Sequence, residues 1–345
     1  MSTDPAWELF KKAARRQATE RVPVALIADS PWLPGLAGIN TLDYYLFQEQ
    51  WLQINRSLFE RWPEIAWIPG CWVEYGMAIE PSAFGARIHF YPNQPPSVEP
   101  VHGDLRQWAE IRPADPLSDG LMPLALRWMK VMAPRVKTEG LRMNVACARG
   151  PLAVGSWLCG ITPLLEGFAT EPELVYRFLE SLTTTTIGWL QAQLDCMPDA
   201  EGILLLDDVV GMVSKRHYEA LLAPHLHRIF NTFSGLVRIF HNDTPCGHLF
   251  GSLPEAGFDV FNFSHQVDLA LALSKMAGRA VLMGNVPPLA LGVRGSPEQV
   301  YESARACVKQ AGGAPGLILS FGGGVSPGTP PENIDALLKA SQDEL

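Results

Sequence analysis

Two apolar segments in the C-terminal third decide the fold: Ala280-Val-Leu-Met-Gly284 and Gly316-Leu-Ile-Leu-Ser320. Neither segment alternates between apolar and polar residues, which is typical of parallel strands that are buried on both faces. Between them, Ser296-Pro-Glu-Gln299 begins a helical segment with an N-cap serine and a proline in the first turn. A strand, a helix and a strand in this order predict a parallel βαβ unit.

The same alternation extends upstream through most of the chain. We expect six further strands, at residues 22–29, 64–69, 142–146, 202–207, 237–241 and 258–262. Residues 80–120 are rich in proline and lack periodicity, so an irregular insertion with a β-hairpin beginning at residues 86–91 is expected there.

These elements predict one (β/α)8 TIM barrel spanning residues 1–345, because no change of composition divides the chain. An amphipathic helix within residues 1–21 would precede the first strand. A doubly wound sheet is the alternative, but no Gly-x-Gly-x-x-Gly motif follows the first strand.

Composition and charge exclude several classes of protein. With 47% hydrophobic and 18% charged residues, the chain has material for a large core. A net charge of −9 argues against a nucleic acid or an anionic membrane as partner. No apolar run approaches the roughly 20 residues that span a bilayer, and the N-terminus lacks a signal core, so we expect a cytoplasmic protein. Six cysteines without Cys-x-x-Cys spacing argue against a disulfide framework.

The closing segments carry a family resemblance. Leu282-Met-Gly-Asn-Val-Pro-Pro288, Gly295-Ser-Pro-Glu-Gln-Val300 and Pro330-Pro-Glu-Asn333 resemble the last part of the uroporphyrinogen decarboxylase superfamily. His241, at the end of a predicted strand, is similar to the family's histidine at that place. Together with the segment after Leu206, these motifs cover residues 165–340 in the family's order.

The resemblance implies one of two chemistries. The decarboxylases carry an N-terminal Arg-Gln-Ala-Gly-Arg motif whose arginines bind the porphyrinogen carboxylates, but the corresponding residues 24–35 contain no arginine. A substrate with many carboxylates needs such cationic partners. The chain therefore resembles the corrinoid-dependent methyltransferase branch. This implies a separate corrinoid protein that supplies a methylcobamide, because no Asp-x-His-x-x-Gly cobalamin motif is present.

The small substrate would be an O-methyl aromatic, a methylated amine, or a thiol or folate acceptor. A homodimer is also expected, because barrels of this superfamily often dimerise. Two alternatives stay open. One is a decarboxylase or lyase that acts on a small carboxylic acid, with Asp207 or Asp243 handling the proton. The other is a non-catalytic barrel that binds a ligand.

The predicted site is centred on His241 and Asp243, which share one side of an extended segment because side chains alternate along a strand. Cys246 follows three residues later. Imidazole, carboxylate and thiolate are all ligands of zinc, so these three residues are candidate metal ligands. Coenzyme M methyltransferases of the branch use a His-x-Cys pair and a later cysteine. This chain instead has Asp243 in the pair and Phe321-Gly-Gly-Gly324 in the later loop.

Three interpretations of these residues remain. A metal is held by His241 and Cys246 with a third ligand, which would be Asp243, Glu74 or His265. Alternatively, His241 and Asp243 act without a metal as acid, base or hydrogen-bond partners. In the third interpretation, Cys246 is simply a small buried hydrophobic residue.

Other candidates surround the expected barrel mouth. Asp207 and Asp208 end one strand and point to opposite faces, so at most one enters the mouth; we assign Asp207 as catalytic, with helix capping as the alternative. Residues after other strand ends are candidates for substrate binding. They are Trp32, Trp72, His265, Asn285 and Gly323. An aromatic mouth would suit a planar apolar substrate, a corrinoid face or a methylammonium group.

Overall fold

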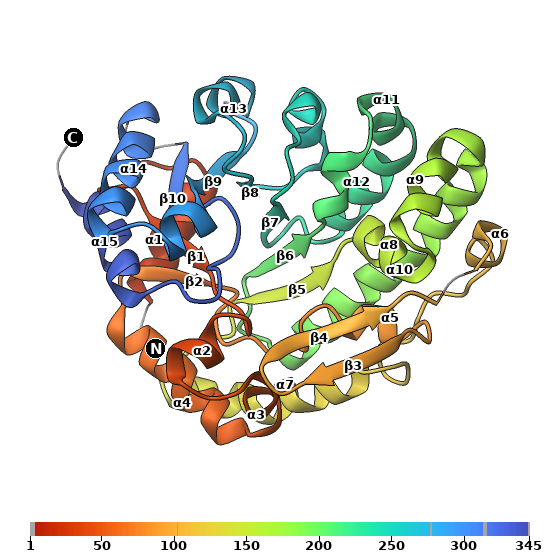
Figure 1. Ribbon diagram of the computed structural model, residues 1–345, viewed down its shortest axis with the longest axis horizontal. Coiled ribbons are helices and arrows are strands. Elements are labelled where there is room, and N and C mark those ends of the chain that lie inside the picture. Colours follow the sequence, from red (N-terminus) through yellow and green to blue (C-terminus); the bar gives the residue numbers. More distant parts are fainter. Residues whose placement is uncertain (1–3, 102, 277, 313–315, 344–345) are drawn as a thin grey trace.

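The computed structural model describes residues 4–101, 103–276, 278–312 and 316–343. Eight parallel strands form one sheet in the order β2-β1-β10-β9-β8-β7-β6-β5, and helices surround it (Figure 1). The strands are β1 (Val24–Ile27), β2 (Ile65–Ile68), β5 (Val145–Arg149), β6 (Gly202–Leu206), β7 (Val237–Asn242), β8 (Val260–Phe263), β9 (Val281–Val286) and β10 (Leu317–Phe321). The predicted TIM barrel is therefore confirmed.

The barrel closes between β2 and β5 through a short seam rather than a full ladder. One isolated antiparallel bridge pairs Gly70 with Met143. At this seam the Cys71 N–H donates to the Arg142 carbonyl at 2.8 Å, and the Asn144 N–H donates to the Pro69 carbonyl at 3.1 Å. The strand expected at residues 142–146 therefore begins later, because residues 142–144 are used for closure.

The α-helices follow one another in chain order, and most of them cover the outside of the barrel. They are α1 (Pro5–Ala14), α2 (Leu33–Ala37), α3 (Thr41–Leu46), α4 (Gln48–Arg61), α5 (Ile79–Ser82), α6 (Leu105–Trp108), α7 (Met122–Thr138), α8 (Pro151–Cys159), α9 (Ile161–Thr170), α10 (Pro172–Cys196), α11 (Lys215–His217), α12 (Ala223–Thr232), α13 (Leu269–Met276), α14 (Pro297–Gln310) and α15 (Pro331–Gln342). The predicted hairpin is formed by β3 (Arg87–Tyr91) and β4 (Gln94–Glu99), drawn in orange in Figure 1. Ser296 caps α14 through a capping box, as its sequence predicts.

The barrel interior is filled by side chains that alternate along each strand. The inward pairs include Ala25 and Ile27, Val145 and Cys147, Leu204 and Leu206, and Val237 and Ile239. Two residues after each of these pairs, the next side chain with the same inward orientation is polar. These residues are Asp29, Arg149, Asp208 and His241. The apolar interior therefore ends in a polar layer at the carboxyl ends of the strands, where barrel enzymes place their sites.

Helix α1 closes the opposite end of the barrel. Trp7 and Phe10 belong to the interior cluster, and their rings stack with centroids 5.1 Å apart. The Trp7 indole N–H donates to Glu201, directly before β6, at 2.7 Å. Within the described ranges, no single helix is long and apolar enough to cross a membrane; only α8 and α9 taken together pass, with a bend of 110° between them.

Truncating Trp7 should destabilise the barrel because it leaves a cavity at this end and removes the bond to Glu201. We expect Trp7→Ala to lower the free energy of unfolding by about 3–5 kcal/mol, measured by denaturant titration. Lys12→Ala, on the exposed side of the same helix, should change it by less than about 0.5 kcal/mol. Equal effects of the two substitutions would contradict the role assigned to α1.

Candidate active site

His241 presents one ring nitrogen to the barrel mouth because the other is occupied. Its Nδ1 lies 2.6 Å from Oδ1 of Asn262, on the neighbouring strand β8. The amide nitrogen of Asn262 donates to the carbonyls of Met283 and Phe321, at 2.9 and 3.0 Å, which leaves Oδ1 as the acceptor. The neutral imidazole therefore carries its proton on Nδ1 and directs the lone pair of Nε2 toward the mouth.

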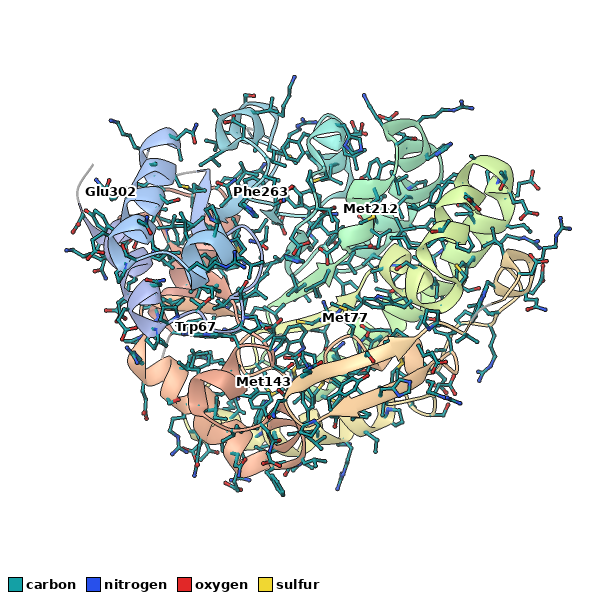
Figure 2. The ribbon with its side chains drawn as sticks, viewed as in Figure 1. Trp67, Met77, Met143, Met212, Phe263 and Glu302 are labelled. Carbon is teal, nitrogen blue, oxygen red and sulfur yellow. The ribbon has the colours of Figure 1, made fainter. Side chains whose placement is uncertain are left out.

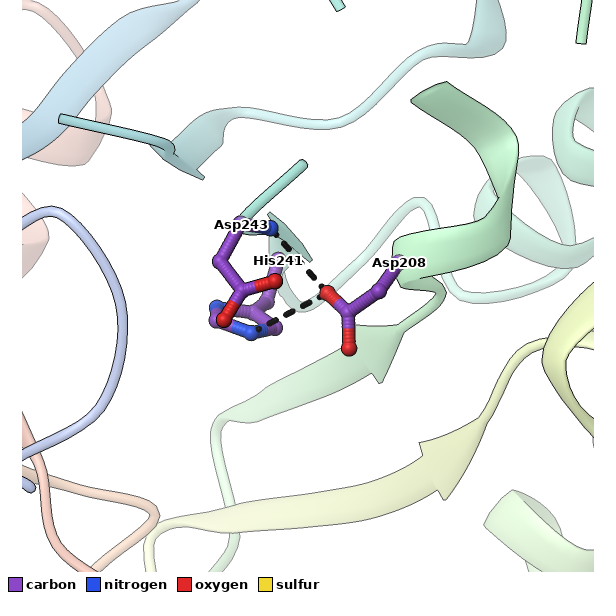
Figure 3. Close-up of side chains that lie close together, drawn as sticks. All are labelled: Asp208, His241 and Asp243. Atoms are coloured by element: carbon purple, nitrogen blue, oxygen red, sulfur yellow. Dashed lines mark hydrogen bonds and ion pairs between the residues drawn. The ribbon is translucent and has the colours of Figure 1, made fainter. Parts of the chain in front are cut away.

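Two carboxylates face this nitrogen. Asp208 Oδ1 lies 3.4 Å from His241 Nε2, and the same oxygen accepts the backbone N–H of Asp243 at 3.0 Å (Figure 3). One ligand atom from each of Asp208, His241 and Asp243 lies within 4.8 Å of the others. Desolvation and the neighbouring Asp208 carboxylate raise the pKa of Asp243, so a cation here would relieve repulsion between the two acids.

The carboxylate of Asp207 lies outside this group. It is fully buried and accepts the backbone N–H groups of Leu152 and Ala153, at 3.0 and 2.9 Å, in the first turn of α8. Position 150 must be glycine here, because an added Cβ would lie 2.2 Å from the Asp207 carboxylate. The place in the mouth that the sequence analysis gave to Asp207 is taken by Asp208, while Asp207 caps a helix other than the one that follows it.

Cys246 is also separate from the three candidate ligands. It follows β7 directly before a short 3-10 turn, Gly247–Leu249, and its side chain is completely buried in the main core. Burial raises the pKa of its thiol to about 12, so the thiolate that a metal needs is disfavoured. This position agrees with the interpretation of Cys246 as a small hydrophobic residue.

The predicted substrate-binding residues have different surroundings. Trp32 is buried against Trp67, with ring centroids 6.0 Å apart, and its N–H donates to the Thr329 carbonyl, so it packs in the outer core. Asn285 is buried and its amide donates to the Val267 carbonyl at 3.0 Å. These contacts give both residues a structural role.

Gly323, His265 and Trp72 lie nearer to the polar layer. A Cβ at Gly323 would lie 3.8 Å from Oδ2 of Asp243, which places this loop beside the candidate ligands. Partly exposed His265 contacts the same loop, because a Cβ at Gly322 would lie 2.5 Å from its backbone nitrogen. Trp72 belongs to the interior cluster, and the Arg149 guanidinium lies 5.8 Å from its ring centroid.

A second polar cluster lies around the ends of β1, β2 and β5. The buried Glu74 accepts the Ser30 backbone N–H through Oε1, while its Oε2 has no partner among the described residues. Asp29 interacts electrostatically with both Arg149 and His241, so it is within electrostatic range of both clusters. Burial raises the pKa of Asp29 to about 6 and that of Glu74 to about 8. The sequence gives one indication of Asp29: it follows Ala25 and Ile27 at a spacing of two residues, so its side chain shares their inward orientation.

The family model described as "Uroporphyrinogen decarboxylase (URO-D)" matches residues 6–343. The chain belongs to the uroporphyrinogen decarboxylase family. This confirms the family that the closing motifs indicated. The solved structure of a methyltransferase from Methanosarcina mazei superimposes with a TM-score of 0.82 over 97% of both chains, at 20% sequence identity. At that identity the likeness concerns the fold.

Curated relatives in this family are named uroporphyrinogen decarboxylase. The protein from Nocardia farcinica is 34% identical over 176 residues, which are 49% of this chain and 48% of that protein. The protein from Pelobacter propionicus is 28% identical over 270 residues, or 76% of each chain. The chain thus spans about half the length of the Nocardia relative and of a similar one from Rhodococcus opacus.

The raised pKa of Glu74 has a consequence for stability. Because the folded-state pKa lies near 8 and the usual value is 4.5, this carboxyl favours folding fully below 4.5, and that contribution is lost as pH rises toward 8. Glu74→Gln is neutral at every pH. The unfolding free energy of the wild type should therefore fall relative to that of the variant across this range, as measured by denaturant titration.

Glu173→Gln, at an exposed position, is the matched control for the change of one charge. Parallel pH curves for wild type and Glu74→Gln would contradict burial of an ionisable Glu74.

Proposed function

We propose that this chain is a methyltransferase of a corrinoid-dependent system, with a zinc ion held by Asp208, His241 and Asp243. The observation that carries the proposal is the convergence of three ligand atoms within 4.8 Å at the carboxyl ends of β6 and β7. Barrel enzymes of all chemistries place their reacting groups at this end.

The residues present fit a divalent ion. Two carboxylates balance its charge, and the Asn262–His241 bond fixes the tautomer that offers Nε2 as a ligand. A carbonyl or carboxylate partner on the second imidazole nitrogen is the usual companion of a metal-bound histidine. When bound, zinc would supply Lewis-acid activation of a thiol acceptor or of the donor heteroatom.

The chain's own residues position and shield the reacting groups. Side-chain hydrogen bonds from Asn242 and Thr244 to backbone carbonyls tie the β7 end to the β6 end: the Asn242 side-chain amide donates to the Asp207 carbonyl at 2.8 Å, and the Thr244 hydroxyl donates to the Asp208 carbonyl at 2.7 Å. The two carboxylates are thereby held at a fixed separation. Below them, the apolar interior excludes water from the inner side of the site.

The methyltransferase assignment rests on the chemistry of the mouth as well as on the resemblance. In the loop after β1, residues 28–38 contain no arginine or lysine, so the mouth lacks there the cationic groups that a porphyrinogen with many carboxylates needs. The corrinoid would be carried by a partner protein. A small-acid lyase and a non-catalytic binding barrel are the outcomes that the following experiments distinguish from methyl transfer.

Removing a proposed ligand should remove the metal. We expect one zinc ion in the wild-type protein after dialysis, and its loss in His241→Ala and Asp243→Asn, measured by elemental analysis. Cys246→Ala should keep the metal because this thiol lies outside the group. Loss of zinc in Cys246→Ala, with retention in Asp243→Asn, would contradict the ligand set.

The same variants test the reaction itself. Methyl transfer is followed with methylcobalamin and a small thiol as probes. His241→Ala should lower the rate by about 100-fold or more, since metal activation contributes several kcal/mol to such reactions. A zinc-loaded wild type that moves no methyl group to or from cobalamin probes would overturn the methyltransferase assignment and favour a binding barrel.

Asn262 should affect the zinc affinity of the site although it is not a proposed ligand. Replacing it with alanine frees Nδ1 of His241 and allows the other tautomer, so zinc affinity should fall by about 10- to 100-fold. Competition with a fluorescent chelator measures the affinity. Asn333→Ala controls for general loss of stability, because Asn333 is a buried asparagine on α15 whose amide also donates to backbone carbonyls; equal losses of zinc affinity in both variants would argue against a specific role for Asn262.

A further inference from the structure

Arg149 is a buried cation that has no ion-pair partner in the part of the chain that the structure describes. It ends β5 in the inward phase of Val145 and Cys147, and only 9% of its surface is exposed. Among the described residues its guanidinium forms one hydrogen bond, from Nη2 to the Gly76 carbonyl at 3.3 Å, and no ion pair. A guanidinium carries five N–H donors, and no nitrogen of Arg149 is among the fully buried side-chain atoms without a partner, so the donors that form no protein hydrogen bond remain open to a ligand.

The acids nearest to Arg149 do not use those donors. Glu80 accepts the backbone N–H of Arg149 at 2.7 Å rather than the side chain. Glu74 accepts the backbone N–H of Ser30 through Oε1, and its Oε2 has no hydrogen-bond partner among the described residues. Burial raises the pKa of Glu74 to about 8, so at neutral pH this side chain is mostly uncharged and able to donate a hydrogen bond. None of these carboxylates is hydrogen-bonded to the guanidinium, which leaves its remaining donors to a ligand.

We propose that Arg149 binds the carboxylate group of a small substrate, with Oε2 of Glu74 as a second polar contact. This inference deepens the proposed function, on which its last step rests: the bound carboxylate would hold the other end of the substrate toward Asp208, His241 and Asp243. Asp29 interacts electrostatically with both Arg149 and His241, so the two clusters lie within range of the same carboxylate. A planar guanidinium fork matches a carboxylate with two parallel hydrogen bonds.

The residues around Arg149 favour a ligand that carries one negative charge on an apolar body. The Trp72 ring stands beside the guanidinium, and a dianion such as phosphate would meet Asp29 and Glu80 nearby. Met77 and Met212, 43% and 52% exposed, extend from the segments after β2 and β6 on this face of the barrel and are both labelled in Figure 2. Flexible thioether side chains adapt to apolar ligands of different shape.

Binding of simple probes tests this site without any reaction. 4-Methoxybenzoate, its neutral amide and the corresponding benzylamine are titrated calorimetrically into the protein, together with inorganic phosphate. The carboxylate should bind more tightly than the other three probes. Arg149→Met, which keeps the apolar stem beside Trp72, should weaken carboxylate binding by about 10- to 100-fold, the usual loss for hydrogen bonds to a charged group, and leave amide binding nearly unchanged.

Two further variants separate the site from general effects. Arg216→Met removes an exposed arginine on the same face and should leave all probe affinities unchanged. Glu74→Leu removes the second polar contact and should weaken carboxylate binding by a smaller factor than Arg149→Met does. Carboxylate binding that survives in Arg149→Met, preference for the amine or phosphate, or no measurable carboxylate binding would each overturn the proposal. If the protein binds carboxylates selectively but transfers no methyl group, the proposed function is contradicted and the carboxylate site is not.

Discussion

The hydrogen bond between His241 and Asn262 is set by the register of two neighbouring barrel strands. In that register His241 stands opposite Asn262 on β8 and opposite Leu206 on β6. Asn262 in turn reaches the carbonyls of Met283 and Phe321, so four consecutive strands of the barrel determine the direction of one imidazole. A shift of β7 by one residue would turn the histidine out of the barrel. The candidate metal site is thus a property of the sheet as a whole.

The seam between β2 and β5 has a complementary role. Because a single bridge replaces a ladder there, the chain around Gly70 leaves the sheet early, and the segment that follows carries Trp72 and Glu74 toward the mouth. Arg149 meets them from the end of β5. The barrel mouth therefore has two polar regions, a carboxylate–imidazole group on β6 and β7 and an acid–guanidinium cluster at the seam, with Asp29 interacting with both.

The family determines the fold of this chain, whereas the residues at these positions determine the reaction that the barrel can support. The fold is shared with curated decarboxylases and with a solved methyltransferase, and such a barrel hosts different reactions through the residues at its strand ends. Here the inward-facing positions at the strand ends carry Asp29, Arg149, Asp208 and His241. One buried guanidinium suits a ligand with one carboxylate, whereas a ligand with many would need several.

The sequence by itself indicated the barrel, because apolar runs without alternation are typical of strands buried on both faces, and it placed His241 and Asp243 on one side of a segment, because side chains in a strand alternate with period two. The sequence did not decide which of Asp207 and Asp208 faces the interior of the barrel. Every residue from Ile203 to Leu206 is apolar, so no polar position reveals which side of β6 faces inward. Nor did it reveal the direction of His241, the burial of Cys246 or the exposure of Arg149 to the mouth. Those depend on strand register and on closure at the seam, which arise from contacts between residues far apart in the chain.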